Sequence, residues 1–266
     1  MKNKNLIINS SALFVIATIL HMTLHEKAHF IAANLLGAKD VTLYHNYVRF
    51  DVSELPLSSH MMIAAAGPLF SLILGIIFHL ICSMYKKRNT LFLFFLYMAA
   101  FSYIAFFGYL AIAPFFVNGD TGFIFSSLGF PLWLTILIAI AGVGAFFLVP
   151  KKLWNYFIEM APADIIADMS LRRPFANALL KYPLYIGIVV TTLLNLPAPA
   201  LLSLIYPLCS PFALMWFYGY LVETPYTGTN ANTNFEALNK LQPALLMVLA
   251  LVIIMNRLLV FGFSLQ

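Results

Sequence analysis

The segment His25-Glu26-Lys27-Ala28-His29 has residue types and spacing that can do chemistry, because it carries the pattern H-E-x-x-H. On a helix, residues four apart are separated by about 40° of rotation and roughly 6 Å of rise, so both imidazoles face one side and can bind one zinc ion. Glu26 lies beside them and can reach a zinc-bound water as general base. We therefore predict that His25 and His29 are zinc ligands and that Glu26 is catalytic.

A third histidine, His21, continues the same i, i+4 stripe. A straight helix cannot wrap His21, His25 and His29 around one ion, because the outer pair are about 12 Å apart along the axis. Glu26 is flanked by the other two in the order that the motif needs, so we expect His21 to lie behind the ligands or to face the substrate. The remaining histidines are expected at the surface or in hydrogen bonds: His45, His60 and His79.

Tetrahedral zinc needs a third protein ligand, which leaves the fourth position for water. Asp120 is the single carboxylate between Glu54 and Glu159, and it follows a long apolar stretch. Pro114 interrupts that stretch, and glycines at 119 and 122 allow the backbone to leave helical geometry and to aim a short side chain into a cavity. We predict Asp120 as the third ligand; the alternative is a turn aspartate at the membrane surface.

The elements that position these residues are membrane helices. The chain of 266 residues is 62% hydrophobic and 9% charged, which excludes an ordinary soluble domain. Its surplus of basic residues lies beside apolar runs, where lipid headgroups explain it without nucleic acid. We expect an all-α polytopic protein of a bacterial cytoplasmic membrane, whose first apolar run is retained and not cleaved as a signal peptide. Spans of about twenty residues are predicted near 6–36, 59–84, 90–117, 131–149, 183–206 and 243–263.

A seventh span is the alternative, because Pro197 and Pro199 can divide the apolar stretch 183–221 into two. Residues 41–52 are rich in β-branched and aromatic types and predict a short membrane-associated hairpin. Residues 150–182 mix charged and aromatic types, as in an interfacial amphipathic helix. We divide the chain into a catalytic three-helix core, 1–130, and additional transmembrane helices, 131–266.

Three segments resemble the motifs of the site-2 protease family of intramembrane zinc metalloproteases. Residues 24–37, LHEKAHFIAANLLG, are similar to the first motif of that family, in which H-E-x-x-H precedes small residues and a glycine. Residues 64–69, AAAGPL, open the next span as the A-G-P segment of the family does. Asn118-Gly-Asp120 stands where the family has its aspartate ligand. The resemblance covers about the first 125 residues and departs from the pattern at Lys27, Ser71 and Gly119.

The resemblance implies hydrolysis of a peptide bond in or near a transmembrane segment of a membrane-protein or membrane-bound peptide substrate. It implies Zn²⁺ on His25, His29 and Asp120, with Asn118 near the metal or the substrate. A helical substrate must unwind first, and the hairpin at 41–52 can pair with an extended substrate by strand addition. The short loops leave no room for a regulatory domain, so access is direct or through a separate partner. The oligomeric state is not predicted.

Other classes remain open from the sequence. A membrane-embedded protease of the CAAX-processing type would use a glutamate as third ligand, and Glu159 is available. A di-iron desaturase would need about eight histidines, and this chain has 6. A transporter or a metal-free relative is the non-enzymatic alternative. The orientation is open too, because the positive-inside rule places the N-terminus in the cytoplasm whereas the family comparison suggests the reverse.

Overall fold

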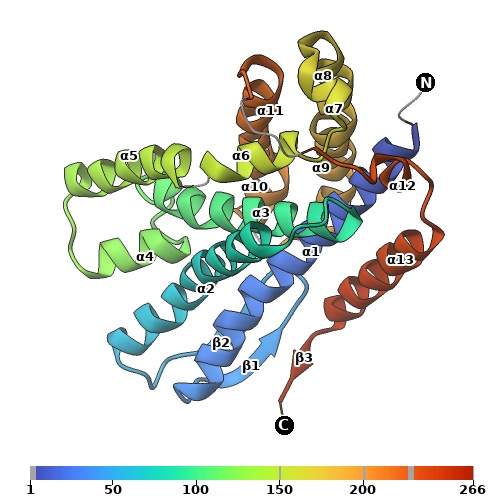
Figure 1. The fold of residues 1–266 in the computed structure, drawn as a ribbon. Coiled ribbons are helices and arrows are strands. Elements are labelled where there is room, and N and C mark those ends of the chain that lie inside the picture. The colour runs from blue at the N-terminus through green and yellow to red at the C-terminus, as the bar shows by residue number, and fades with distance from the viewer. Residues whose placement is uncertain (1–3, 150, 200–201, 227–230, 266) are drawn as a thin grey trace.

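A computed structural model describes residues 4–149, 151–199, 202–226 and 231–265. Helix α1 (Lys4–Leu35) runs through the middle of the molecule, and α2 (Leu57–Met84), α3 (Thr90–Ile112), α9 (Tyr182–Leu194) and α13 (Pro243–Leu258) pack against it (Figure 1). Residues 9–19 of α1 are buried all round, as expected of a helix that is apolar on every side and lies inside a bundle. The helix that carries H-E-x-x-H is therefore held by its neighbours on several sides.

The other helices complete the bundle. They are α4 (Asp120–Ser127), α5 (Leu132–Leu148), α6 (Lys151–Ile158), α7 (Ala163–Ala167), α8 (Met169–Ala176), η1 (Asn177–Lys181), α10 (Leu202–Cys209), η2 (Ser210–Ala213), α11 (Leu214–Glu223), α12 (Phe235–Leu238) and η3 (Leu259–Phe261). Within the described residues, seven helical segments are long and apolar enough to cross a membrane: Lys4–Leu35, Leu57–Met84, Thr90–Ile112, Leu132–Ile158, Met169–Leu194, Ser203–Glu223 and Pro243–Phe261. The chain is thus an all-α, multi-pass membrane protein.

The count of seven favours the division of the stretch 183–221, because α9 ends at Leu194 and the next span starts at Ser203. Part of that stretch, residues 200 and 201, lies outside the described residues, as do 227–230 of the polar loop that follows α11. The run Met169–Leu194 begins well before the predicted start at 183, so the second half of the segment expected to be interfacial joins a candidate span. Residues of its first half, including Trp154 and Phe157, are buried in the main core.

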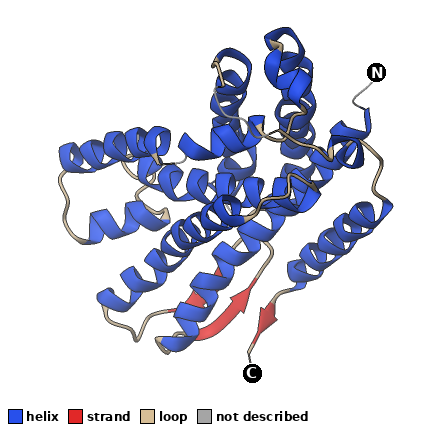
Figure 2. Cartoon of the chain, viewed as in Figure 1, coloured by secondary structure: helices blue, strands red, loops and turns tan. Residues whose placement is uncertain are grey.

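The predicted hairpin is present and carries a third strand. Strand β1 (Lys39–Leu43) pairs antiparallel with β2 (Val48–Asp51) on one edge and with β3 (Phe263–Ser264), at the C-terminal end, on the other. Figure 2 shows the three strands gathered beside the C-terminal half of α1. Because the order is β2-β1-β3, β1 is covered on both edges, and β2 keeps one edge that pairs with no strand in the described part of the chain.

Aromatic packing against α1 fixes the position of α3. The Phe14 ring of α1 contacts Tyr97 and Phe101 edge-on, with centroids 5.8 and 4.8 Å apart. Gly187 of α9 lies so near Phe14 that an added Cβ would be 2.1 Å from the ring. Offset aromatic contacts of this kind hold helices at a defined separation. They hold α3 and α9 closely against α1.

Candidate metal centre

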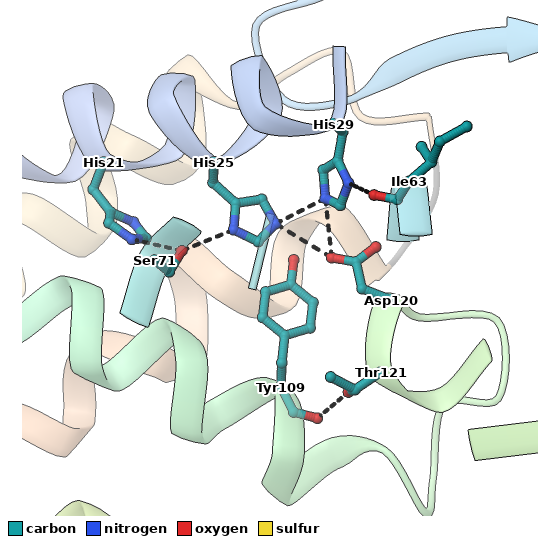
Figure 3. Close-up of polar contacts among 8 residues, drawn as sticks. All are labelled: His21, His25, His29, Ile63, Ser71, Tyr109, Asp120 and Thr121. Atoms are coloured by element: carbon teal, nitrogen blue, oxygen red, sulfur yellow. Dashed lines mark hydrogen bonds and ion pairs between the residues drawn. The ribbon is translucent and has the colours of Figure 1, made fainter. Parts of the chain in front are cut away.

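The side chains of His25, His29 and Asp120 meet at one point between α1 and α4 (Figure 3). The two Nε2 atoms are 3.2 Å apart, and each is 3.2 Å from Oδ2 of Asp120. The three ligand atoms therefore form an equilateral triangle, although 95 positions separate His25 from Asp120 in the chain. Among the described residues, these three are the group of His, Cys, Asp and Glu side chains found able to hold one metal ion.

This triangle fits tetrahedral zinc. Bonds of about 2.0–2.1 Å from one zinc ion place its ligand atoms about 3.3 Å apart, close to the 3.2 Å seen on all three edges. Both imidazoles are buried, with His25 4% and His29 7% exposed. Two neutral imidazoles and one carboxylate are also the donor types that zinc prefers. The spacing and the chemistry of these residues therefore fit a zinc ion.

The far nitrogen of each histidine ring is occupied by a hydrogen bond. His29 Nδ1 donates to the carbonyl oxygen of Ile63 at 2.7 Å, and a carbonyl can only accept, so a neutral His29 has its lone pair on Nε2. His25 Nδ1 lies 3.0 Å from Ser71 Oγ. Partners of this kind fix the ring orientation and direct Nε2 toward a metal. Both Ile63 and Ser71 belong to α2.

Gly67 of α2 makes the space in which the ligand atoms meet. A Cβ at this position would lie 2.2 Å from His29 Nε2 and 2.5 Å from His25 Nε2. No residue other than glycine can therefore occupy position 67 while both imidazoles keep their places. This close approach gives a physical reason for a glycine in the A-G-P segment of this chain.

Asp120 is placed by a sharp reversal after α3. That helix ends at Ile112, and Asp120 begins the short helix α4, so the chain returns toward α1 instead of continuing as one span to 117. Gly122 packs against the Phe116 carbonyl, where a Cβ would be 2.0 Å from the oxygen. Thr121 donates from Oγ1 to the carbonyl of Tyr109 at 2.6 Å. These contacts hold the turn and aim Asp120 inward.

Two tyrosines complete the surroundings, and neither was predicted from the sequence. The ring of Tyr109 stacks on His25 with centroids 5.1 Å apart and planes 7° apart, and its hydroxyl points toward Asp120 (Figure 3). Tyr206 of α10 makes a 2.9 Å hydrogen bond with His21 Nδ1. Aromatic residues are common in membrane helices, so only their position in space distinguishes these two.

A cavity of about 440 Å³ opens at the ligand atoms. Its walls include Glu26, Asn118 and Tyr206, together with Val48 and Phe50 of β2. Glu26 is half-buried, whereas Lys27 is exposed and lies outside the cavity lining. The predicted general base, the polar Asn118 and two residues of β2 therefore line the same space as the ligands.

The remaining histidines lie in hydrogen bonds away from the ligand triangle. His60 contacts the Val52 carbonyl at 2.8 Å, and His79 contacts the Tyr103 hydroxyl at 3.3 Å. His45, in the β1–β2 turn, contacts the carbonyl of Asn195 at 3.2 Å. Burial lowers the pKa of His45 because it disfavours the charged imidazolium.

Glu159 is engaged at a separate place. Its Oε2 accepts hydrogen bonds from Arg88 at 2.6 and 3.0 Å, and its Oε1 accepts one from the hydroxyl of Tyr226 at 2.8 Å. The side chain is 6% exposed. A buried carboxylate with both oxygens bound in this way has a structural explanation that requires no metal.

Compared with known proteins, the chain matches no family model, no curated protein and no solved structure.

Proposed function

We propose that this protein is an intramembrane zinc metalloprotease that resembles the site-2 protease family and works in a bacterial cytoplasmic membrane. One observation carries the proposal: the ligand atoms of His25, His29 and Asp120 lie 3.2 Å from one another inside a bundle of membrane helices. Glu26 faces the same cavity. An H-E-x-x-H helix, an acid from a distant element and an adjacent carboxylate are the parts that zinc-dependent peptide hydrolysis needs.

When bound, a zinc ion supplies electrophilic activation of water and of the scissile carbonyl. Glu26 acts as the general base, because its carboxylate lines the cavity next to the ligand atoms and can accept a proton there. The same carboxylate then returns the proton to the nitrogen of the leaving amine. Tyr109 holds the plane of His25 by stacking, and Ile63 and Ser71 hold the two rings by hydrogen bonds.

The substrate is an extended segment of a membrane protein or membrane-bound peptide that lies along β2. The Tyr44 N–H donates to the Tyr47 carbonyl, and bonded pairs alternate along antiparallel strands, so Val48 and Phe50 direct their main-chain groups to the open edge. Their side chains line the cavity. Strand addition at this edge satisfies the main-chain groups that an unwound substrate helix exposes, and presents its carbonyls to the site.

Two alternative functions have less support from the observed contacts. A CAAX-type protease would use Glu159, but both oxygens of that side chain are bound by Arg88 and Tyr226. A transporter or metal-free relative would not need three ligand atoms at zinc spacing. Metal analysis separates all three possibilities.

The test uses the full chain, purified in detergent, with zinc measured per chain and cleavage of a model membrane-spanning substrate followed in parallel. We expect one zinc in the wild type, its loss in His25→Ala and Asp120→Ala, and its retention in Glu26→Gln together with a fall in kcat of about 10²–10⁴. His79→Ala is the matched control, because it removes a hydrogen-bonded histidine outside the site. Wild-type protein without zinc, or full cleavage by Glu26→Gln, would show that the proposal is wrong.

A further inference from the structure

A continuous series of hydrogen bonds leads from the ligand His25 to Tyr206, and both residues line the cavity. His25 Nδ1 lies 3.0 Å from Ser71 Oγ, and the same oxygen lies 3.2 Å from His21 Nε2. His21 Nδ1 lies 2.9 Å from the hydroxyl of Tyr206. The first two contacts are visible in Figure 3. His21 is 1% exposed and Ser71 0%, so little solvent reaches these bonds.

These hydrogen bonds must all run in one direction, with each group donating to the next, because each group has a fixed number of hydrogens. Ser71 has one hydroxyl hydrogen and stands between two histidine nitrogens, so it can donate to one and must accept from the other. A neutral imidazole likewise donates at one nitrogen and accepts at the other. A doubly protonated His21 would place a charge in a fully buried position, which is costly. If the protonated nitrogen of His25 is fixed, the donor and the acceptor in each of the other hydrogen bonds of the series are therefore fixed too.

Coordination at His25 selects one direction. With the Nε2 lone pair of His25 on a cation, Nδ1 carries the hydrogen and donates to Ser71. Ser71 then donates to His21 Nε2, His21 donates from Nδ1 to the Tyr206 oxygen, and the hydroxyl hydrogen of Tyr206 is left for another acceptor.

Without a cation the chain can run the opposite way. His25 Nε2 then donates to Asp120 Oδ2, 3.2 Å away, and the Tyr206 hydroxyl donates to His21 Nδ1. The four residues hold the same number of protons in both directions. When a cation binds, His25 Nε2 gives its proton to cavity water, and Tyr206, whose hydrogen passes to His21, takes a proton from cavity water, so the number of protons on the four residues is unchanged.

Tyr206 is well placed to use the hydrogen that coordination releases. It lines the same cavity as Glu26 and the ligands. Its ring stacks on His21, with centroids 5.8 Å apart and planes 21° apart, which limits its rotation. The Tyr206 hydroxyl can therefore donate a hydrogen bond to an acceptor in that cavity, such as a peptide carbonyl. Because the donor is already held in place, it does not have to reorganise during the reaction.

We propose that Tyr206 donates a hydrogen bond to a carbonyl oxygen of the substrate, and that Ser71 and His21 are positioning residues that make this donor available when a cation occupies the site. The inference rests on the proposed metal centre. It assigns a use to His21, the histidine left over from the H-E-x-x-H stripe, and to Ser71, which departs from the family pattern.

The direct test reads the tautomer of His21 by ¹⁵N NMR of the detergent-solubilised full chain, with His21→Phe to assign the signal. With zinc bound, we expect the proton on Nδ1 and the lone pair on Nε2. Chelation of zinc should change the tautomer of His21 in the wild type. It should leave that tautomer unchanged in Ser71→Ala, because this variant lacks the hydroxyl that links His25 to His21. The same His21 tautomer with and without zinc, or a charged His21 with zinc bound, would overturn the inference.

Kinetics of peptide cleavage at saturating zinc give a second reading. Tyr206→Phe should keep zinc and lower kcat about 10²–10³-fold with little change in KM, as for the loss of one donor to a developing oxyanion. Ser71→Ala should lower kcat in part and Ser71→Thr should restore it. The double variant Ser71→Ala/Tyr206→Phe should be no slower than Tyr206→Phe, because both changes act on one donor.

Two variants of α3 residues are matched controls for these changes, because they lie outside the hydrogen-bonded series from His25 to Tyr206. Tyr103→Phe removes a hydroxyl from another tyrosine–histidine pair, with His79. Ser102→Ala removes a buried hydroxyl that has no hydrogen-bond partner among the described residues. Neither should alter kcat. If the losses of kcat of the two single variants multiply in the double variant, Ser71 does not act through Tyr206 and the inference is wrong. Zinc binding without any cleavage by the wild type would reject the protease proposal and leave the tautomer result standing, whereas a failure to bind zinc would overturn both.

Discussion

Gly67→Ala should abolish zinc binding without unfolding the protein. The added Cβ would lie 2.2 Å from His29 Nε2 and 2.5 Å from His25 Nε2, whereas ordinary contact begins at 3.4 Å. The two ligand atoms would therefore have to retreat by about 1.2 and 0.9 Å from the methyl group. Displacements of that size are comparable with half a zinc–nitrogen bond of about 2.0 Å.

The rings cannot make this movement freely. His29 is held at Nδ1 by the Ile63 carbonyl and His25 by Ser71, both on the helix that carries Gly67. Breaking one of these bonds costs about 1 kcal/mol, and overpacking a filled site costs about 1–3 kcal/mol. Loss of a supporting contact alone weakens a metal site 10–100-fold. We expect at least a hundredfold weaker zinc binding and a modest fall in stability.

The assay is isothermal titration of zinc into chelator-treated protein in detergent, with a thermal melt on the same sample. Gly144→Ala in α5 is the matched control, because a Cβ there meets nothing within 4 Å. It should bind zinc as the wild type does and gain up to about 1 kcal/mol from its better helix propensity. Wild-type zinc affinity in Gly67→Ala would refute the argument that this glycine makes room for the ligands.

Three other predictions follow from separate contacts. Glu159→Ala should cost up to about 3–5 kcal/mol of stability, because it removes the carboxylate partner of Arg88, whose side chain is only 13% exposed, yet the folded protein should keep its zinc. Loss of zinc with unchanged stability would favour the CAAX-type alternative. Because burial lowers the pKa of His45 in the folded state, stability should fall as the pH drops below the unfolded value of about 6.5. Melting temperatures from pH 7.5 to 5 should then decline less steeply in His45→Gln, and parallel declines would contradict this. Phe50→Pro should reduce cleavage far more than Phe50→Ala at a comparable melting temperature, because both variants lose the packing of the ring against a buried cluster, whereas proline also removes the outward main-chain N–H of β2. Equal activities would exclude strand addition at this edge.

Local patterns predicted much of the architecture. Apolar runs of span length gave the membrane helices, because a lipid-buried backbone must satisfy its own hydrogen bonds. The alternative with a seventh span agrees with the structure. The β-branched segment at 41–52 predicted β1 and β2, but β3 has two residues, Phe263 and Ser264, and is too short to leave a pattern. Helix α4 was missed for a similar reason, since a helix of eight residues after a proline carries little periodic signal.

The sequence alone determined the half of the candidate site that lies on one helix. The i, i+4 spacing of His25 and His29 fixes their common face through helix geometry, which needs no tertiary information. The sequence also singled out Asp120 as an isolated acid, and the fold brings it within 3.2 Å of both imidazoles. Only the tertiary structure placed Gly67, Ser71, Tyr109 and Tyr206 around the ligands, because their contacts join separate helices whose packing depends on side-chain shape and not on spacing along the chain.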